Sequence, residues 1–234
     1  RFRFGRANIG PLAQPGPPVD DFRTGAIARA TRVRDAARTA VSDWRDQGHA
    51  KAEVSGQTIV ARHGDAQLDV DITLAPGPRA RFGEVTVSGE SRVKPARVRQ
   101  IAGIPRGALF MPAAVEKAES RLRRTGTFQS VRIMEADRVD RDGKLDMDIV
   151  LSDRKPRRIG AGAEISSLDG LTLSGYWLHR NFLGGAERFR VDGEVSQIGQ
   201  TGEGIDYRLK FRFERPAVYG PDTLFFAELE FDYF

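Results

Sequence analysis

Strict alternation of apolar and polar side chains marks the last third of the chain. It is cleanest in residues 187–198, 204–215 and 223–234, and looser in residues 159–165 and 171–182. Because successive side chains of a strand point to opposite faces, we expect each segment to form a strand with one apolar and one charged face. The apolar face of residues 204–215 consists of Ile205, Tyr207, Leu209, Phe211 and Phe213.

Strands of this kind fit two architectures. A soluble β-sandwich buries the apolar face against a second sheet, whereas an outer-membrane β-barrel turns that face to lipid and the charged face to a wet lumen. The three clean segments run for about 12 residues. That length exceeds the roughly 5–6 residues of globular strands and is closer to the roughly 9–11 of membrane strands. Length therefore favours barrel strands, with the five apolar residues of 204–215 facing lipid.

Charges on the polar faces indicate how the strands pair. A turn near Tyr219 and another near Thr201 would place one basic strand between two acidic strands. The predicted pairs across these turns are Lys210–Glu228, Arg208–Glu230, Arg208–Glu194 and Lys210–Asp192. The same pattern also fits charges that are simply solvated in a wet lumen, because the sequence alone does not determine either register.

A repeat with a period close to 78 residues covers the first two thirds of the chain. Gly48 returns as Gly126 at an offset of 78, and residues 68–74 match residues 145–151 at an offset of 77. Matches that keep their order and spacing are the signature of repeated structural modules. The predicted modules are residues 1–78 and 79–157, and the alternating strands occupy residues 158–234.

The second module has a legible order of elements. Residues 80–88 alternate as a strand, and Pro95 to Ala102 form a short helix. A longer helix begins at Pro112, where the missing N–H of proline costs nothing, and ends before Gly126 as a C-terminal cap. Residues 128–134 and 145–151 form two further strands, which gives the order β-α-α-β-β. The apolar face of the longer helix consists of Val115, Ala118 and Leu122.

The first module is expected to repeat this order. Its main helix ends before Gly48, and the proline-rich segment from Gly10 to Pro18 must be a loop. The apolar face of the main helix consists of Val33, Ala37, Val41 and Trp44, and a role in the core is the simplest interpretation of that face.

Composition adds mostly exclusions. The chain carries a net charge of +5 and a sequence pI near 9.8, but its basic residues are spread among acidic ones, so nucleic acid is not an expected partner. It has no cysteine, and no apolar run approaches the roughly 20 residues of a membrane helix. Its three histidines share no ligand spacing. The glycines of residues 199–204 lack the Lys-Ser/Thr of a phosphate loop and predict a flexible hairpin tip. Neither a catalytic site, a metal nor a cofactor is predicted.

Two further features concern the ends and the middle of the chain. It begins at Arg1 without methionine and stops at Phe234 inside a strand pattern, so we expect it to be a piece of a longer protein. The densest basic run joins the second module to the strands. Its residues, Arg154, Lys155, Arg157 and Arg158, either contact lipid headgroups or form a solvated linker, and the linker is favoured.

The residues at this point resemble the outer-membrane assembly and translocation factors of the BamA-like superfamily, which place tandem polypeptide-transport-associated (POTRA) domains before a large β-barrel. The phrases RFGEVTVSG, GTFQSVRI and LDMDIVLSDRKPRRIGAGAEIS are similar to a POTRA domain that runs directly into a first barrel strand. GYWLHRNFLGGAERFRV is similar to the second strand, a periplasmic turn and the third strand, and most resembles the TamA-type member. FRFERPAVYG resembles the fourth strand and its turn.

This resemblance implies the fold and the function. The fold is α+β, with tandem POTRA domains followed by antiparallel strands of a truncated transmembrane β-barrel. The function is non-enzymatic: the POTRA domains lie in the periplasm, the barrel lies in the bacterial outer membrane, and β-rich clients are inserted or exported. The implied partners are unfolded outer-membrane or autotransporter clients, the lipid bilayer and an inner-membrane partner of TamB type.

Two strands carry the implied sites. An extended client adds to an exposed edge strand through main-chain hydrogen bonds, and here that strand is Phe128, Gln129, Ser130, Val131, Arg132, Ile133 and Met134. The first barrel strand pairs weakly with the last in this family, and here it is Ile159, Gly160, Ala161, Gly162, Ala163, Glu164 and Ile165. The small residues of that strand fit a weakly anchored seam, or only a bend without a gating role.

Two other functions remain open. One is a two-partner secretion exporter of the same superfamily. The other belongs to a different class, a soluble periplasmic α+β binding protein with a terminal β-sandwich. Further alternating segments beyond Phe234 would discriminate the barrel from the sandwich.

Overall fold

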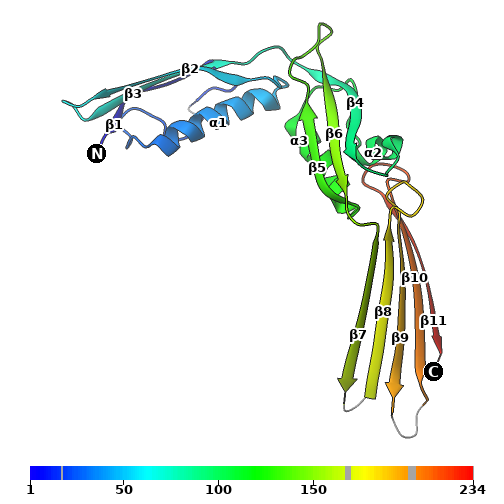
Figure 1. Cartoon of the computed structure of the whole chain (residues 1–234). Coiled ribbons are helices and arrows are strands. Elements are labelled where there is room, and N and C mark those ends of the chain that lie inside the picture. Colours follow the sequence, from blue (N-terminus) through cyan, green and yellow to red (C-terminus); the bar gives the residue numbers. More distant parts are fainter. Residues whose placement is uncertain (17, 167–169, 200–203, 234) are drawn as a thin grey trace. The chain divides into compact units, whose positions relative to one another are not determined.

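The computed structural model describes residues 1–16, 18–166, 170–199 and 204–233 (Figure 1). The chain divides into two compact units. The first unit contains Arg1–Glu84, Pro105–Val115 and Glu135–Met147, and the second contains Val85–Ile104, Glu116–Met134 and Asp148–Phe234. Residues of the second repeat module therefore contribute to both units. None of the described helices is both long and apolar enough to cross a membrane.

The first module consists of β1 (Arg3–Gly10), α1 (Ala30–Asp46), β2 (Glu53–Arg62) and β3 (Gln67–Ala75). Its sheet has the order β1-β3-β2, with β1 parallel and β2 antiparallel to β3. Helix α1 lies along one face of this sheet (Figure 1). The core between them includes Phe4, Val33, Ala36, Ala40, Val70, Ile72 and Leu74, with Ala37, Val41 and Trp44 partly buried at its margin.

The first module departs from the predicted β-α-α-β-β order. Among its described residues α1 is the single helix, and the segment between β1 and α1 consists of turns and bends with one isolated bridge. This segment contains Pro11, Pro15 and Pro18, and proline cannot donate a helical hydrogen bond. Phe22 from this segment is buried in the core of the module.

The second module consists of β4 (Arg81–Glu90), α2 (Pro95–Ala102), α3 (Pro112–Arg124), β5 (Phe128–Glu135) and β6 (Lys144–Asp153). This order confirms β-α-α-β-β for the module, and its sheet has the order β4-β6-β5. Helix α2 keeps its predicted bounds because proline starts it and Gly103 ends it in the left-handed region, at φ 61°.

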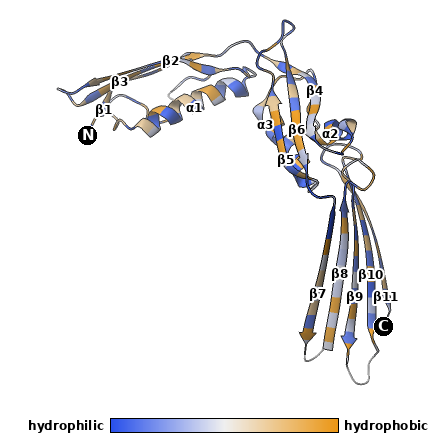
Figure 2. Ribbon diagram, viewed as in Figure 1, coloured by the Kyte–Doolittle hydropathy of each residue, from blue (hydrophilic) through white to orange (hydrophobic). Residues whose placement is uncertain are grey.

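Five strands follow the second module: β7 (Arg157–Ser166), β8 (Gly170–Arg180), β9 (Arg188–Ile198), β10 (Asp206–Pro216) and β11 (Leu224–Tyr233). They form one antiparallel sheet in which each strand pairs with the next along the chain. Hydrophobic and hydrophilic bands alternate along these strands (Figure 2). Ile205 lies just before β10 rather than within it. The hairpin tip predicted for residues 199–204 falls largely on residues 200–203, outside the described residues.

Of the two predicted strand registers, one is correct. Arg208 lies opposite Glu194 and Lys210 opposite Asp192, as predicted for β9 and β10. Between β10 and β11, Lys210 lies opposite Glu230, so the predicted pair with Glu228 is two residues out of register. The turn is centred one residue later than predicted, at Gly220 rather than Tyr219, and the N–H of Ala217 donates to the carbonyl of Thr223 at 2.7 Å to close it. A shift of two residues leaves every side chain on its predicted face.

Candidate functional site

Strand β5 lies at an edge of its sheet, as the sequence predicted for residues 128–134. The N–H of Ala136, just beyond β5, donates to the carbonyl of Asp146 at 2.9 Å. Since backbone groups of alternate residues point to opposite sides of a strand, the groups of Val131 and Ile133 point away from β6. These outward groups are the ones that an added strand would use.

The outward groups of β5 already have side-chain partners on α3. The N–H of Ile133 donates to Oε1 of Glu119 at 3.0 Å, and Nη2 of Arg123 donates to the carbonyl of Val131 at 3.3 Å. Glu119 and Arg123 also form an ion pair with each other, four residues apart on one face of the helix. We call these two side chains the α3 clasp. Sequence reasoning missed it, because such a pair on a helix is usually only a surface pair.

Strand β7 is an edge of the five-stranded sheet and pairs with β8. It contains all seven residues predicted for the seam, and the pairing explains one of the small ones. A Cβ at Gly160 would lie 2.3 Å from Cε1 of Tyr176, so only glycine lets that ring lie across the neighbouring strand. The guanidinium of Arg190 stacks on the same ring, 4.4 Å from its centroid. A packing reason for Gly160 does not test whether the strand parts from a neighbour, and the seam stays a prediction.

The apolar face of the sheet lies open within the described residues. Tyr207 and Leu209 are 50% and 41% exposed, and Phe231, which is opposite Leu209 on β11, is 59% exposed. Aromatic rings gather on this face near the turn between β8 and β9: the centroid of Phe189 lies 6.2 Å from that of Trp177 and 5.2 Å from that of Phe182. Such a girdle is typical of the interfacial ends of membrane strands. The lipid-facing role of this face remains a prediction.

The opposite face carries a network of charges. Arg208 bonds Asp232 at 2.9 Å and Glu194 at 3.1 Å, so one basic side chain joins both neighbouring strands. Lys210 contacts Glu228 at 2.8 Å and Glu230 at 3.4 Å. The predicted Lys210–Glu228 contact therefore forms, but diagonally rather than directly across the pair.

The turns of this sheet are bonded to α2. The N–H of Lys94 donates to the carbonyl of Gly184, in the turn between β8 and β9, at 2.9 Å. Nη2 of Arg97 donates to the carbonyl of Pro216 at 2.6 Å, and Nε2 of Gln100 donates to that of Ala217 at 3.0 Å. Within the second unit, hydrogen bonds from Lys94, Arg97 and Gln100 thus connect the second module to the β8–β9 turn and the β10–β11 turn.

Helix α3 holds the turn between β10 and β11 through Asp222. Both carboxylate oxygens of Asp222 accept from Arg121, at 2.7 and 2.6 Å, and Lys117 lies 3.4 Å away. The hydrogen bonds from Arg121, helped by its charge, hold the pKa of Asp222 well below its usual range. Close packing accompanies the pair, since a Cβ at Gly103 would lie 2.3 Å from Cγ of Pro221 in the same turn.

Acid is expected to weaken this contact. A carboxylate whose pKa is depressed by folding contributes stability above its unfolded pKa of about 3.9, and that contribution is lost as the pH falls through the lower folded value. Asp222→Asn should therefore raise the hydrogen-exchange rate of the 217–223 turn at pH 6, and the difference from wild type should shrink below about pH 4. A difference that persists unchanged at the lowest pH would contradict this account of the ion pair.

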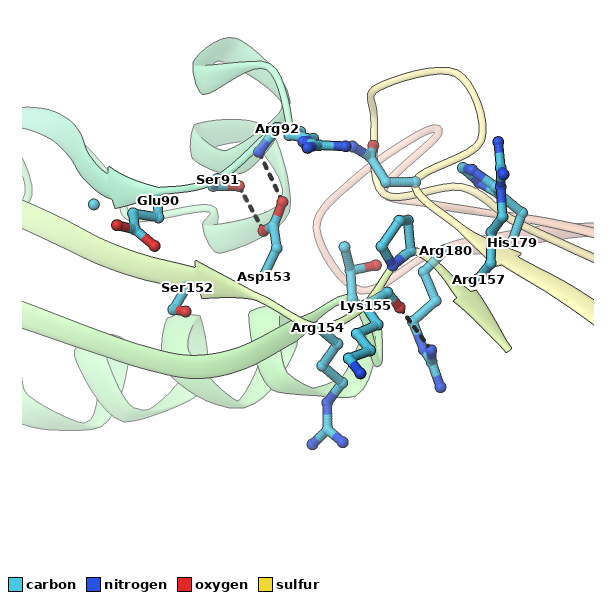
Figure 3. A pocket seen from close by; sticks show the side chains of 14 residues that line it. Glu90, Ser91, Arg92, Ser152, Asp153, Arg154, Lys155, Arg157, His179 and Arg180 are labelled. Carbon is cyan, nitrogen blue, oxygen red and sulfur yellow. Dashed lines mark hydrogen bonds between the residues drawn. The ribbon is translucent and has the colours of Figure 1, made fainter. Parts of the chain in front are cut away.

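A cavity of about 1160 Å³ lies where β6 leads into β7, and Figure 3 shows the side chains around it. Asp153 accepts from Oγ of Ser91 at 2.8 Å and from the N–H of Arg92 at 2.7 Å. Nε of Arg154 donates to the carbonyl of Phe128 at 2.9 Å, and Nη1 of Arg180 donates to that of Lys155 at 3.0 Å. The predicted linker is therefore fastened to the module by Arg154, and contact with headgroups stays untested.

The described residues contain no group of three His, Asp or Glu side chains that could hold a metal ion. The sequence did not predict a role for the residues that connect α2 and α3 with the turn between β10 and β11. These residues are Arg97, Gln100, Arg121 and Asp222. Each bond joins residues more than 100 positions apart in the sequence, and no local pattern marks them.

Comparisons with known proteins match this architecture. A family model described as POTRA, surface antigen variable number repeat, matches residues 80–152. The outer membrane protein assembly factor BamA of Neorickettsia risticii (strain Illinois) is 23% identical over 224 residues, which cover 92% of this chain and 29% of that protein. The chain thus spans less than a third of the length of this curated relative.

Solved structures share the fold. The crystal structure of BamA from Haemophilus ducreyi lacking POTRA domains 1–3 has a TM-score of 0.78 and 17% identity, and the match covers 99% of this chain and 43% of that one. CdiB from Escherichia coli has a TM-score of 0.52 and 15% identity, with coverage of 99% and 42%. These matches confirm the predicted fold class, POTRA-like modules followed by antiparallel strands that correspond to part of a barrel.

Proposed function

We propose that this chain, a member of the Omp85/BamA superfamily with POTRA modules and barrel strands, is the part of an outer-membrane protein assembly or translocation factor that receives client strands. Its strands belong to the outer membrane and its modules to the periplasm. The function is non-enzymatic: it consists of binding extended chains and passing them to the barrel.

One observation carries the proposal. The second module presents an edge strand, β5, and the same module is bonded through α2 and α3 to the turns of a sheet with an open apolar face. An edge strand recruits an extended chain without regard to its side chains, because the bonds are made by the main chain. A second edge, β7, lies at the first barrel strand, where we propose that clients enter the membrane.

The finer identity is also a proposal. The sequence resemblance supports a TamA-type factor with unfolded outer-membrane or autotransporter clients and a TamB-type inner-membrane partner. It further supports POTRA domain bounds of 1–78 and 79–157. Copurification of the full-length protein with a large inner-membrane protein that spans the periplasm supports the TamA-type proposal, and copurification with outer-membrane lipoproteins alone contradicts it.

The edge strand is tested by Val131→Pro in the full-length protein. The N–H of Val131 points away from β6, so proline removes a donor from the free edge and leaves the β6 ladder intact. We expect client crosslinking at this edge to fall about tenfold, which corresponds to the loss of roughly one main-chain hydrogen bond. Site-specific photocrosslinking at the exposed neighbour Gln129 measures it.

Val131→Ala is the matched control. Val131 is 5% exposed, so both variants lose packing at the same site, but alanine keeps the N–H. Crosslinking should therefore stay close to the wild-type level in the alanine variant and fall about tenfold in the proline variant. Equal crosslinking in both variants, with the module folded, would remove β5 as the client-binding edge.

A further inference from the structure

The α3 clasp occupies the same backbone groups that an added strand needs. Val131 and Ile133 lie two positions apart, and their backbone groups both face away from β6. The N–H of Ile133 is bonded to Glu119, and the carbonyl of Val131 is bonded to Arg123. Glu119 is mostly buried and Arg123 is mostly exposed, with side chains 22% and 60% accessible. Both side chains must leave before a strand can pair with β5 at these two residues.

We propose that Glu119 and Arg123 form a self-closing cover on the β5 edge, which an incoming extended strand must displace in order to bind. This inference rests on the proposed function and concerns how that edge is regulated. The cover mimics a strand: Glu119 supplies the acceptor and Arg123 the donor that an added main chain would offer. It therefore competes with every strand, whatever the sequence of that strand.

A cover of this kind solves a problem that edge strands create. Unpaired N–H and C=O groups at an edge template pairing with any exposed chain, including another copy of the same protein. Bonds from side chains are weaker competitors than a full strand, because a strand makes several main-chain bonds at once. The clasp therefore admits a client that pairs along much of β5 and rejects short or irregular segments.

The two repeat modules differ at the position that matters. At the offset of 78 residues, Glu119 and Arg123 correspond to Val41 and Arg45 of α1. Valine has no acceptor for an edge N–H. Arg45 is engaged elsewhere, since Nη1 donates to the carbonyl of Ala50. The cover is therefore a feature of the second module, which is bonded to the strands. The first module lacks the carboxylate of Glu119 and serves as an internal comparison.

The test measures strand binding by the full chain in detergent. The probe is a fluorescent peptide with the sequence of residues 206–216 of this chain, which has the alternation of a membrane strand. Glu119→Ala should tighten binding of this peptide about threefold to tenfold, the effect of removing one competing hydrogen bond at a partly exposed edge. Glu119→Gln should bind the peptide like wild type, because its amide oxygen still accepts from Ile133. Arg123→Ala, which frees the Val131 carbonyl, should tighten binding by a smaller factor.

Hydrogen exchange provides the second readout. In the free protein, exchange of the Ile133 amide should be faster in Glu119→Ala than in wild type, and the peptide should restore its protection. If Glu119→Ala and Arg123→Ala leave both affinity and exchange unchanged while Val131→Pro weakens binding, the cover is wrong and the edge-strand function stands. If Val131→Pro leaves binding unchanged in the wild-type and Glu119→Ala backgrounds, the peptide does not add to β5, and the proposed function fails with the cover.

Discussion

Leu209→Arg is expected to destabilise the full-length protein in a bilayer by about 2–4 kcal/mol, the cost of a basic side chain at the lipid-facing midplane of a barrel. Leu209 lies in the middle of β10, opposite Gly193 on β9 and Phe231 on β11, on the face that carries no charge at these three positions. Urea unfolding from vesicles, followed by the heat-modifiable mobility of the folded barrel, measures the change.

Lys210→Leu is the matched control on the neighbouring residue, whose side chain lies on the charged face. The contacts of Lys210 with Glu228 and Glu230 are lost, but Lys210 is partly exposed and both carboxylates are exposed, and ion pairs at such a surface contribute little. The variant should therefore stay close to wild type. A large loss in Lys210→Leu together with a small loss in Leu209→Arg would mean that the sheet presents its charged face to lipid, and the orientation proposed for the barrel would be reversed.

Arg97→Ala is expected to loosen the turn between β10 and β11 by about 2 kcal/mol, because a charged hydrogen bond contributes roughly 1.5–3 kcal/mol. Arg97 donates to Pro216 and, at 3.4 Å, to the carbonyl of the fully buried Ala217. Exchange of the Ala217 amide, which closes the turn, should accelerate about thirtyfold. A local measurement suits this chain better than a global one, since several modules do not unfold as one unit.

Two variants bracket this result. Arg97→Lys keeps the charge but replaces the fork of donors with a single ammonium group, so it should recover only part of the protection. Gln100→Ala removes one uncharged bond to Ala217 and should cost about 1 kcal/mol or less. If Arg97→Ala leaves exchange of the turn at the wild-type rate, the turn is held by Asp222 and Gln100 without a contribution from Arg97.

Local patterns predicted the elements that local chemistry determines. Helix α2 keeps both predicted bounds, because Pro95 and Gly103 act within their own turns of the backbone. The period-two pattern predicted the five strands and their faces, because alternation is a property of each strand by itself. The predicted register of β10 with β11 was wrong by two residues, because it depends on which residue lies at the centre of the turn, and the sequence of the turn does not distinguish Tyr219 from Gly220.

Contacts between distant segments escaped prediction. Arg121 and Asp222 are 101 residues apart, and neither stands out from the other charged residues of the chain. The α3 clasp was not predicted for a different reason. The sequence shows Glu119 and Arg123 as a pair on one helix face, but their bonds to β5 depend on how closely α3 lies to the sheet edge. The described residues of the first module contain one helix where two were predicted, because the repeat led us to transfer the element order of the second copy to the first.

Helix α3 bonds to structure on both of its sides. Glu119 and Arg123 reach β5, whereas Lys117 and Arg121 reach Asp222 in the turn of the strands. Positions 119 and 121 are about 200° apart around a helix axis, so the two sets of bonds are made from nearly opposite faces of α3. Thermodynamic linkage then requires any coupling through the helix to be reciprocal. If a bound strand changes the stability of the turn by a given free energy, a change at the turn alters the affinity for the strand by the same free energy.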